Sequence, residues 1–355
     1  MLDQPKHHLT PIKAVFLYNT LSPRVIHYLE KAFQGYLVEL IIPPDTDFET
    51  MRPLVAQADI LIGWKCSPEL LAHASKLRLY ITPYTGVSYL VEAFRELKFP
   101  LTCPIVNAHG AADLIAQHAI ALLFGVLNHL VVHHLEMIAG KWVPGGEGIE
   151  EPYPSLPIGG RKIGLLGYGN VNRRVHTMLK GFPVEIHALR NDWSKLTSSE
   201  ELPNNLPLTK YTPDELEAFM RAIDTLIVAA PLTEKTRGMI TLDHLQLLGP
   251  EGVVVNVGLG KIFREKDLYT ALQTHVISRA ALDVWYVYYP EPDQFGRLWP
   301  YSEAFNSLPN VLLSPHRADS PFEDLRRWDD IIINIKKVVE GRTDYLHIVN
   351  IEAGY

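Results

Sequence analysis

Short apolar runs alternate with amphipathic stretches along almost the whole chain, and this alternation limits the fold more than any other feature. In the first third, the apolar runs lie at residues 14–18, 37–42, 60–62, 77–81 and 102–106, with helical patterns between most of them. Runs of strand length separated by helical patterns indicate βα units, in which helices cover a parallel sheet. At about 150 residues per domain, 355 residues predict two domains of this kind.

A second series of apolar runs begins after residue 161. Six candidate strands follow one another at residues 162–167, 184–189, 225–230, 253–257, 277–282 and 311–313. Six parallel strands suit a doubly wound sheet with helices on both faces. The predicted fold class is therefore α/β, with two Rossmann-like, doubly wound parallel-sheet domains.

The expected domain boundaries follow from two helical patterns. Residues 111–139 form one long pattern, and Pro144, Gly145, Gly146 and Gly148 mark a loop behind it, so the chain crosses between domains nearby. The last helical pattern, 323–340, is too short to form a domain and is expected to pack on the N-terminal sheet. We expect a discontinuous first domain, residues 1–107 plus 320–355, and a second domain at residues 108–319.

Composition narrows the class of protein. The chain is 47% hydrophobic and 21% charged, as in ordinary globular proteins, and its net charge of −7 gives no general reason to bind nucleic acid. Cys66 and Cys103 are too few for a disulfide framework, and residues 1–11 lack a signal-peptide pattern, so a cytoplasmic location is expected. Polar residues interrupt the apolar stretch 119–139, and no membrane span is expected.

A glycine-rich turn follows the first strand of the second series. Gly167 would allow a tight turn, Gly169 would let a pyrophosphate approach the backbone, and the helical pattern at residues 171–180 would offer free N–H groups. The third glycine of this nucleotide-binding pattern is Asn172 here. The turn predicts a dinucleotide site at Gly167, Tyr168, Gly169, Asn170 and Val171.

The end of the next strand bears on the choice of cofactor. Arg190 lies 21 residues beyond Gly169, where an acidic residue would bind the ribose hydroxyls of NAD and a cation would accept the 2′-phosphate of NADP. NADP is therefore favoured over NAD. The alternative is a solvated Arg190 beside Asp192, with the carboxylate binding the ribose.

Ordered motifs along the chain resemble those of the D-isomer-specific 2-hydroxyacid dehydrogenases. They are the segments 84–88 (YTGVS), 107–118 (NAHGAADLIAQH), 230–238 (APLTEKTRG), 255–260 (VNVGLG), 281–285 (ALDVW) and 310–316 (NVLLSPH). The resemblance implies hydride transfer between a nicotinamide and the C2 carbon of a 2-oxo or 2-hydroxy acid, in a cleft between the two domains.

The resemblance also implies roles for individual residues. His316 matches the acid/base and Glu291 its carboxylate partner, although Glu291 lies three residues later than the usual spacing. Thr85, Gly86 and Val87 match the substrate loop. The remaining matches to cofactor contacts are Pro231, Thr236, Val257, Gly258 and Asp283. The apolar face of residues 119–138 and the following loop match the family's dimerisation region, so a homodimer is expected.

One departure from the family pattern concerns the substrate carboxylate. The family has an arginine where this chain has Leu259, and no aliphatic side chain replaces the two charge-assisted hydrogen bonds of a guanidinium. Lys65, Lys261 or Arg317 are alternative sources of the charge. Otherwise the substrate differs, or the protein is an NAD(P)-binding regulatory or corepressor-like protein with little or no turnover.

Further departures are Gln117 in place of glutamate and Ser88 in place of aspartate. His129 and His133 share one helix face near His134 and Glu136, but this long apolar helix is more typical of a domain or dimer contact than of a metal site. No metal is expected.

Overall fold

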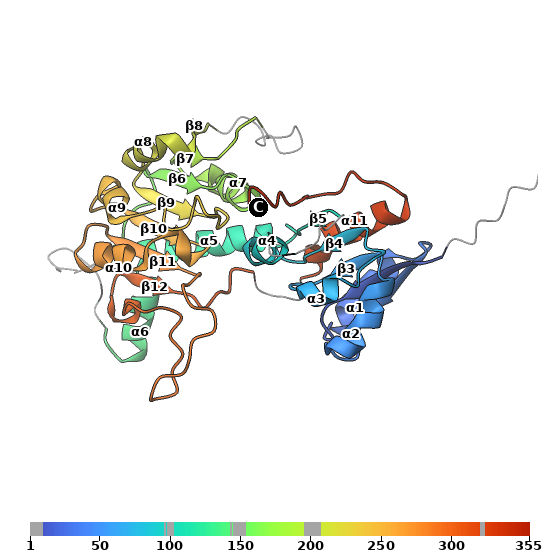
Figure 1. Cartoon of the computed structure of the whole chain (residues 1–355). Coiled ribbons are helices and arrows are strands. Elements are labelled where there is room, and N and C mark those ends of the chain that lie inside the picture. The colour runs from blue at the N-terminus through green and yellow to red at the C-terminus, as the bar shows by residue number, and fades with distance from the viewer. Residues whose placement is uncertain are drawn as a thin grey trace, which may run out of the picture. The chain divides into compact units, whose positions relative to one another are not determined.

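Five parallel strands form the sheet of the first unit, in the order β2-β1-β3-β4-β5. Strands β3 and β4 are buried throughout, which explains their uninterrupted apolar sequences. The strands are β1 (Ile12–Phe16), β2 (Val38–Ile41), β3 (Ile60–Ile62), β4 (Leu79–Ile81) and β5 (Ile105–Val106). The helices between them are α1 (Pro23–Ala32), α2 (Phe48–Gln57), α3 (Pro68–Leu71) and α4 (Ser88–Arg95) (Figure 1).

The computed structural model describes residues 10–95, 97, 103–142, 144, 154–194, 207–319 and 324–355. The chain divides into one unit of residues Met1–Ala111 with Pro321–Tyr355 and a second unit of residues Ala112–Ser320. The sequence pattern predicts these boundaries after residues 107 and 319. The expected loop at Gly145, Gly146 and Gly148 lies outside the described residues.

The C-terminal segment returns to the first unit, where the red helix α11 (Asp329–Val339) lies among the blue elements (Figure 1). A 3-10 turn, η6 (Leu325–Trp328), precedes α11, so the α-helix begins later than the pattern 323–340 predicts. Trp328, Ile331 and Ile335 pack with the strand residues Phe16 and Ile62. This C-terminal helix therefore completes one side of the N-terminal core.

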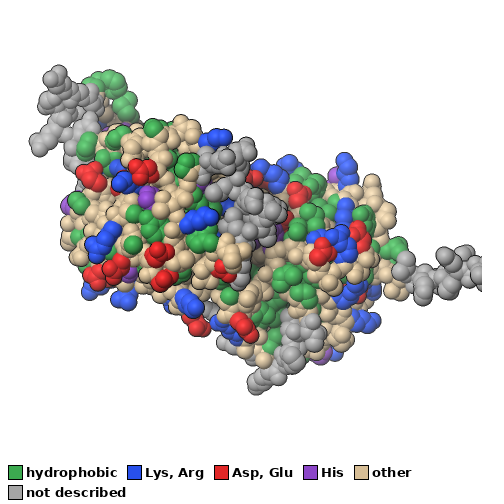
Figure 2. Space-filling model, turned by 90° about the horizontal axis from the view of Figure 1, so that it is seen from above, with side chains coloured by type: hydrophobic (Ala, Val, Ile, Leu, Met, Phe, Trp, Pro, Cys, Tyr) green, Lys and Arg blue, Asp and Glu red, His purple; other side chains and the backbone are tan. Residues whose placement is uncertain are grey.

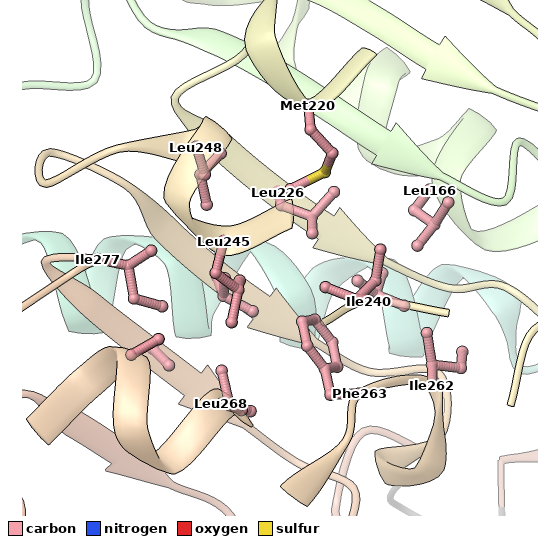
Figure 3. Packing of buried hydrophobic residues seen from close by; sticks show 14 of the residues in the cluster. Leu166, Met220, Leu226, Ile240, Leu245, Leu248, Ile262, Phe263, Leu268 and Ile277 are labelled. Carbon is pink, nitrogen blue, oxygen red and sulfur yellow. The ribbon is translucent and has the colours of Figure 1, made fainter. Parts of the chain in front are cut away.

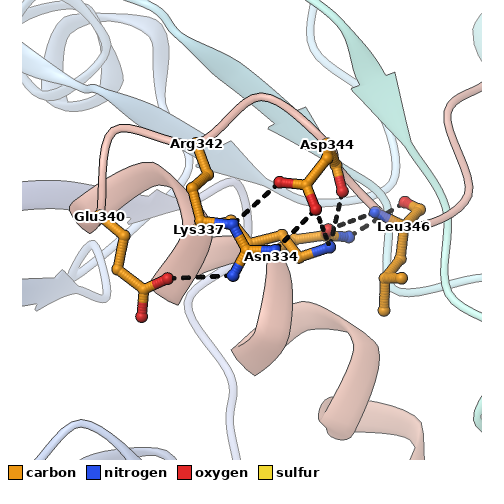
Figure 4. A network of polar contacts seen from close by, with 6 residues as sticks. All are labelled: Asn334, Lys337, Glu340, Arg342, Asp344 and Leu346. Carbon is orange, nitrogen blue, oxygen red and sulfur yellow. Dashed lines mark hydrogen bonds and ion pairs between the residues drawn. The ribbon is translucent and has the colours of Figure 1, made fainter.

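A polar network fixes the chain after α11 (Figure 4). The buried Asn334 side chain donates to the Leu346 carbonyl at 3.2 Å and accepts from the Leu346 N–H at 2.8 Å. Beyond it, Val349 donates to the Ile105 carbonyl, and Ile348 forms an antiparallel bridge with Val106. The tail thus covers the free edge of β5, as exposed sheet edges generally require.

Seven parallel strands form the sheet of the second unit, in the order β12-β11-β10-β9-β6-β7-β8. The strands are β6 (Lys162–Leu166), β7 (Glu185–Leu189), β8 (Thr209–Tyr211), β9 (Thr225–Val228), β10 (Val253–Asn256), β11 (Arg279–Leu282) and β12 (Val311–Leu313). The α-helices are α5 (Ala112–Leu127), α6 (Leu130–Ile138), α7 (Asn170–Met178), α8 (Leu216–Arg221), α9 (Leu242–Leu248) and α10 (Glu265–Gln273). The expected pair of doubly wound α/β domains is confirmed.

The second sheet differs from the prediction in its strand number. Six strands were expected, whereas β8 adds a seventh at the edge, paired to β7. Thr209, Lys210 and Tyr211 are exposed or half-buried, so this edge strand carries no apolar run. Apolar periodicity therefore gives no signal for it.

The long helical pattern 111–139 is also wrong as a single helix. The chain breaks after α5, where His129 adopts a left-handed backbone with φ of 51°, and α6 leaves at 64° to α5. Among the described residues no single helix is long and apolar enough to cross a membrane, and only this bent pair meets the criterion jointly, by length and composition.

The largest buried cluster of the second unit lies between its sheet and helices α8, α9 and α10 (Figure 3). Leu226 and Leu166 come from the strands, Met220 from α8 and Leu245 from α9, and all four are buried. On the surface, Lys and Arg side chains are interspersed with Asp and Glu side chains over the face shown in Figure 2.

Candidate functional site

The strand order of the second sheet reverses between β6 and β9, and at such a point the loops leaving neighbouring strands diverge and leave room for a ligand. Gly167 ends β6 there with φ of +83°, and a Cβ on it would lie 2.5 Å from Cα of Ala230, in the loop after β9. Only glycine fits this approach without strain. The glycine turn therefore lies against Ala230, at the start of the segment 230–238.

Helix α7 begins directly behind this turn. Gly169 is its N-cap residue, no side chain caps the helix, and a Cβ on Gly169 would meet nothing within 4 Å. The N–H groups of the first turn carry partial positive charge, which favours an anion. This combination fits a pyrophosphate placed over Gly169, Asn170 and Val171.

Asn172 replaces the third glycine of the pattern, and its buried amide has its own role. Nδ2 donates to the carbonyls of Leu166 at 3.1 Å and Gly167 at 3.0 Å. These are the two residues that enter the turn. Asn172 therefore stabilises the turn through these hydrogen bonds.

Arg190 leaves β7 beside the glycine turn. Its Nη1 donates to the Tyr168 carbonyl at 2.8 Å and its Nε donates to the Asp192 carbonyl at 2.9 Å. Nη2 has no hydrogen-bond partner among the residues that the structure describes. The guanidinium thus holds the glycine turn through Nη1 and its own loop through Nε, and Nη2 stays available.

A second cation, Lys210, lies near Arg190 on the neighbouring strand. Lys210 pairs with Ala188 in the β7–β8 register, and its Nζ lies 5.1 Å from the ring centroid of Trp193. Trp193 also lies against Tyr168 of the glycine turn, with ring centroids 5.5 Å apart. The sequence gives no signal for Lys210 at this place, because its strand lacks an apolar pattern.

The predicted contacts Pro231 and Thr236 belong to one tight loop. Thr236 Oγ1 donates to the Pro231 carbonyl at 2.7 Å and accepts from the Thr233 N–H at 2.8 Å. Thr236 therefore shapes the loop. Val257 is buried after β10, and a Cβ on Gly258 would lie 3.1 Å from the Ala230 carbonyl oxygen, so this turn also approaches the loop after β9.

Leu259 is half-buried and packs against the largest core cluster. The turn around it is tight, because Asn256 Nδ2 donates to the Leu259 carbonyl and a Cβ on Gly260 would lie 2.5 Å from the Trp285 carbonyl oxygen. The structure thus gives Leu259 an apolar packing role at the position of the family's arginine. Lys261 and Arg317 are both exposed.

Asp283 is buried at the carboxyl end of β11 and accepts several hydrogen bonds. The backbone N–H groups of Arg317 and Ala318 donate to it at 2.7 and 2.9 Å, and the Ser314 hydroxyl donates to Oδ1. His118 Nε2, from α5, lies 3.3 Å from the same Oδ1. Burial raises the pKa of the Asp283 carboxyl, but these hydrogen bonds outweigh it, and the pKa lies below its ordinary value.

His316 is exposed in the loop that Asp283 binds. Its backbone is left-handed, with φ of 57°, and its ring meets Tyr288 edge to face at 5.2 Å. Within the described ranges the Glu291 carboxylate makes no hydrogen bond or ion pair with His316. Glu291 is exposed in the long loop after Trp285, where the segment Tyr286–Pro290 provides the three residues beyond the usual spacing.

The predicted substrate loop follows β4 in the first unit. Thr85 Oγ1 donates to the Ala108 carbonyl at 3.0 Å, and Asn107 Nδ2 donates to the Thr85 carbonyl at 2.7 Å, so Thr85 is held against the segment that follows β5. Gly86 and Val87 follow, with Val87 buried. Lys65 is exposed after β3, next to Trp64, which stacks on Tyr89 at 3.7 Å.

The described residues contain no group of three or more His, Cys, Asp or Glu side chains that could hold a metal ion. His133 and Glu136 form a pair at 4.0 Å on exposed α6, and His129 is buried at the break between α5 and α6.

Together, the reversed strand order, the glycine turn and the uncapped helix define a doubly wound dinucleotide-binding protein. Residues 120–318 match the family model described as "D-isomer specific 2-hydroxyacid dehydrogenase, NAD binding domain". The match spans more than half of the 355 residues. The chain belongs to the D-isomer specific 2-hydroxyacid dehydrogenase family.

Two curated relatives extend the likeness beyond that domain. A glyoxylate reductase of Pyrococcus furiosus is 28% identical over 315 residues, which cover 87% of each chain. A glyoxylate/hydroxypyruvate reductase of Arabidopsis thaliana is 28% identical over 251 residues, 70% of this chain and 69% of the relative.

Solved structures share the fold of the whole chain. An NADPH-dependent glyoxylate/hydroxypyruvate reductase of Sinorhizobium meliloti, in complex with NADP and malonate, has a TM-score of 0.69 at 25% identity and covers 97% of this chain and 98% of its own. A D-isomer specific 2-hydroxyacid dehydrogenase of Xanthobacter autotrophicus, in complex with NADPH, has a TM-score of 0.74 at 20% identity, with coverage of 98% and 100%.

Proposed function

We propose that this chain is an NADPH-preferring reductase of small 2-oxo acids that uses His316 as the general acid. The observation that carries the proposal is the exposed His316 imidazole beside the carboxyl end of β12, on the same sheet as the glycine turn. The names of the relatives, which are reductases of glyoxylate and hydroxypyruvate, support the same class of substrate.

The chemistry divides between cofactor and chain. A bound reduced nicotinamide supplies a hydride, and with it the two electrons that reduce the C2 carbonyl carbon. His316 then donates a proton to the carbonyl oxygen as negative charge develops there, so the 2-oxo acid becomes a 2-hydroxy acid. An imidazole suits this task because it titrates near neutral pH. Glu291 is proposed as its carboxylate partner when the long loop approaches.

The cofactor preference rests on two cations. Arg190 keeps Nη2 available beside the glycine turn, and Lys210 lies on the adjacent strand above Trp193. A 2′-phosphate offers oxygen acceptors to both side chains, whereas a free ribose hydroxyl pairs better with a carboxylate. We therefore propose NADPH over NADH, with Asp283 and the turns at Pro231, Val257 and Gly258 near the nicotinamide and pyrophosphate.

The substrate carboxylate needs a cation other than the missing arginine. Lys65 is exposed and has no ion pair among the described residues, and it follows β3 in the unit that carries Thr85, Gly86 and Val87. We propose that Lys65 takes this role. Leaving a desolvated carboxylate unpaired would cost about 2–5 kcal/mol.

The test is oxidation of NADPH and NADH by the purified chain with glyoxylate, hydroxypyruvate, pyruvate and bulkier 2-oxo acids, together with cofactor titrations. We expect turnover with NADPH and at least one of these acids. Tight NADPH binding with no turnover on any acid would reject the reductase and leave a cofactor-binding protein.

One observation favours that second candidate. The aliphatic Leu259 packs into the core where the family has its arginine, and Glu291 is not paired with His316 in the described part of the chain. A Leu259→Arg variant separates the two functions. A dormant site would gain turnover on glyoxylate, whereas a site adapted to another acid would lose activity on that acid.

We also propose that the protein is a homodimer that associates through α6. Leu135, Met137 and Ile138 of this helix are 58%, 53% and 70% exposed, and Trp142 behind it is 75% exposed. No residue of α6 is buried. An apolar helix of this kind is typical of a surface that a second copy covers.

A further inference from the structure

The loop that carries His316 is held on both sides by one carboxylate. Ser314, two residues before His316, donates its hydroxyl to Asp283 Oδ1, and the N–H groups of Arg317 and Ala318 donate to the two oxygens of Asp283. The Trp285 indole also donates to the Ser314 carbonyl at 2.9 Å. The backbone position of His316 therefore depends on the Asp283 carboxylate.

A second imidazole lies on the same oxygen. His118 Nε2 is 3.1 Å from Ser314 Oγ and 3.3 Å from Asp283 Oδ1. Because the Ser314 hydroxyl already donates to Asp283, its oxygen accepts from His118, so Nε2 carries a hydrogen. His118 reaches this group from α5, 196 residues away from Ser314.

The loop needs this support because the backbone of His316 is left-handed. A left-handed φ costs a residue with a side chain about 1 kcal/mol or more, and it persists only where neighbouring contacts enforce it. His316 itself has only the edge contact with Tyr288 among the described residues. The enforcing contacts are therefore those of residues 314, 317 and 318.

We propose that His118 is a positioning residue for the acid/base loop. Through Nε2 it orients the Ser314 hydroxyl toward Asp283 and completes the set of donors around that carboxylate, so that the His316 imidazole is presented in one pose. His118 touches neither substrate nor cofactor in this role. The inference rests on the proposed function of His316 and adds a residue to it.

The test compares His118→Gln, which keeps an N–H donor at a similar reach, with His118→Leu, which removes it. We expect the leucine variant to lose about 100-fold in kcat on the best 2-oxo acid, because small misplacements of a catalytic group cost that much. Its Kd for NADPH, measured by fluorescence, should change less than threefold. The glutamine variant should recover kcat to within about fivefold of the wild type.

A second measurement reports on the order of the loop and does not require catalytic turnover. Hydrogen exchange of the peptide that contains residues 317 and 318 should accelerate about tenfold in His118→Leu and Ser314→Ala and stay unchanged in His118→Gln. The control is His27→Leu, an exposed histidine on α1, which should change neither quantity.

The outcomes are separable. If the wild type reduces no 2-oxo acid, the proposed function fails, and the exchange data alone decide the role of His118. Unchanged kcat and exchange in His118→Leu would overturn the positioning role, as would equal losses in the leucine and glutamine variants. If the leucine variant does not fold, Ser314→Ala and the glutamine variant carry the same comparison.

Discussion

At the scale of single residues, the role of His316 as a proton donor can be tested separately from its left-handed backbone conformation. Asparagine adopts the left-handed region more readily than most side chains. A His316→Asn variant should therefore keep the loop and the thermal midpoint while losing the proton donor. We expect kcat to fall by about 10²–10⁴-fold, the usual contribution of a general acid, with Kd for NADPH unchanged.

The comparison for this prediction is His316→Val. A β-branched residue at φ of 57° should lower the thermal midpoint as well as kcat. Equal kcat in wild type and His316→Asn would exclude His316 as the acid.

Arg190 is the residue on which the cofactor preference depends. Replacement by serine should weaken NADPH binding about 10–100-fold, because a hydrogen bond to a charged group contributes about 1.5–3 kcal/mol. It should weaken NADH binding less, because NADH loses only the support that Arg190 gives to the Tyr168 carbonyl of the glycine turn. Fluorescence titration of both nucleotides measures this. Lys210→Ala should give a smaller effect in the same direction. Unchanged NADPH affinity in Arg190→Ser would instead favour Asp192 as the ribose ligand.

Sequence patterns predict the place in the fold of residues whose environment is local. Gly167, Gly169 and Arg190 follow strands directly, so their positions follow from the βα pattern. His118 was not recognised, because its partners Ser314 and Asp283 are distant in the sequence and meet only through the packing of α5. The pairing of Glu291 with His316 remains a prediction.

At the scale of elements, the break between α5 and α6 involves buried hydrogen bonds, which the pattern of apolar residues does not predict. The buried Arg279 guanidinium donates to the Val126 and Leu127 carbonyls at the end of α5. The Val126 carbonyl also accepts from the His129 N–H, and the Leu127 carbonyl accepts from the Leu156 N–H at 2.9 Å, so several donors satisfy the carbonyls at this helix end. A side chain on β11, 152 residues from Leu127, thus contributes to the end of α5, while the apolar pattern continues past the break.

His129, at that break, makes stability depend on pH. Burial, and then the charges of Arg279 and His133, lower its pKa to about 4. The folded state therefore resists protonation, so its stability is full above about pH 6.5 and falls as the pH drops toward 4. Burial lowers the pKa of His176 to about 4 as well, with the same sign.

A His129→Asn variant removes one of these two contributions and suits the left-handed backbone. The fall in the free energy of unfolding between pH 7 and pH 5 should be about 1 kcal/mol smaller than in the wild type. Urea titrations at both pH values measure it. Equal falls in both proteins would show that His129 titrates normally.

The network behind α11 offers a contrast between buried and exposed polar contacts. Asn334→Ala leaves the N–H and carbonyl of Leu346 without their partner, and should lower the free energy of unfolding by about 1–3 kcal/mol. Arg342→Ala breaks an exposed pair with Asp344, whose pKa this arginine lowers to about 2, and should lower the free energy of unfolding by less than Asn334→Ala does. The reverse order in urea titrations would contradict this.

At the scale of the whole molecule, the exposed face of α6 predicts the state of association. A double variant, Leu135→Glu with Ile138→Glu, should convert a particle of twice the chain mass into one of the chain mass, measured by light scattering after size exclusion. An exposed pair on another helix, Glu217→Lys with Arg221→Glu on α8, is the matched control. A wild type that is already monomeric would refute the proposed dimer.

The return of α11 to the first unit sets an order for biosynthesis. Strands β1–β5 leave the ribosome first, but Trp328, Ile331 and Ile335, which fill their core, are translated only after the entire second unit. Units generally fold as they emerge, so the second unit can complete its core while the first still exposes apolar strands. The part of the protein that is made first is thus the part that is finished last, and it is the part most in need of protection by chaperones during synthesis.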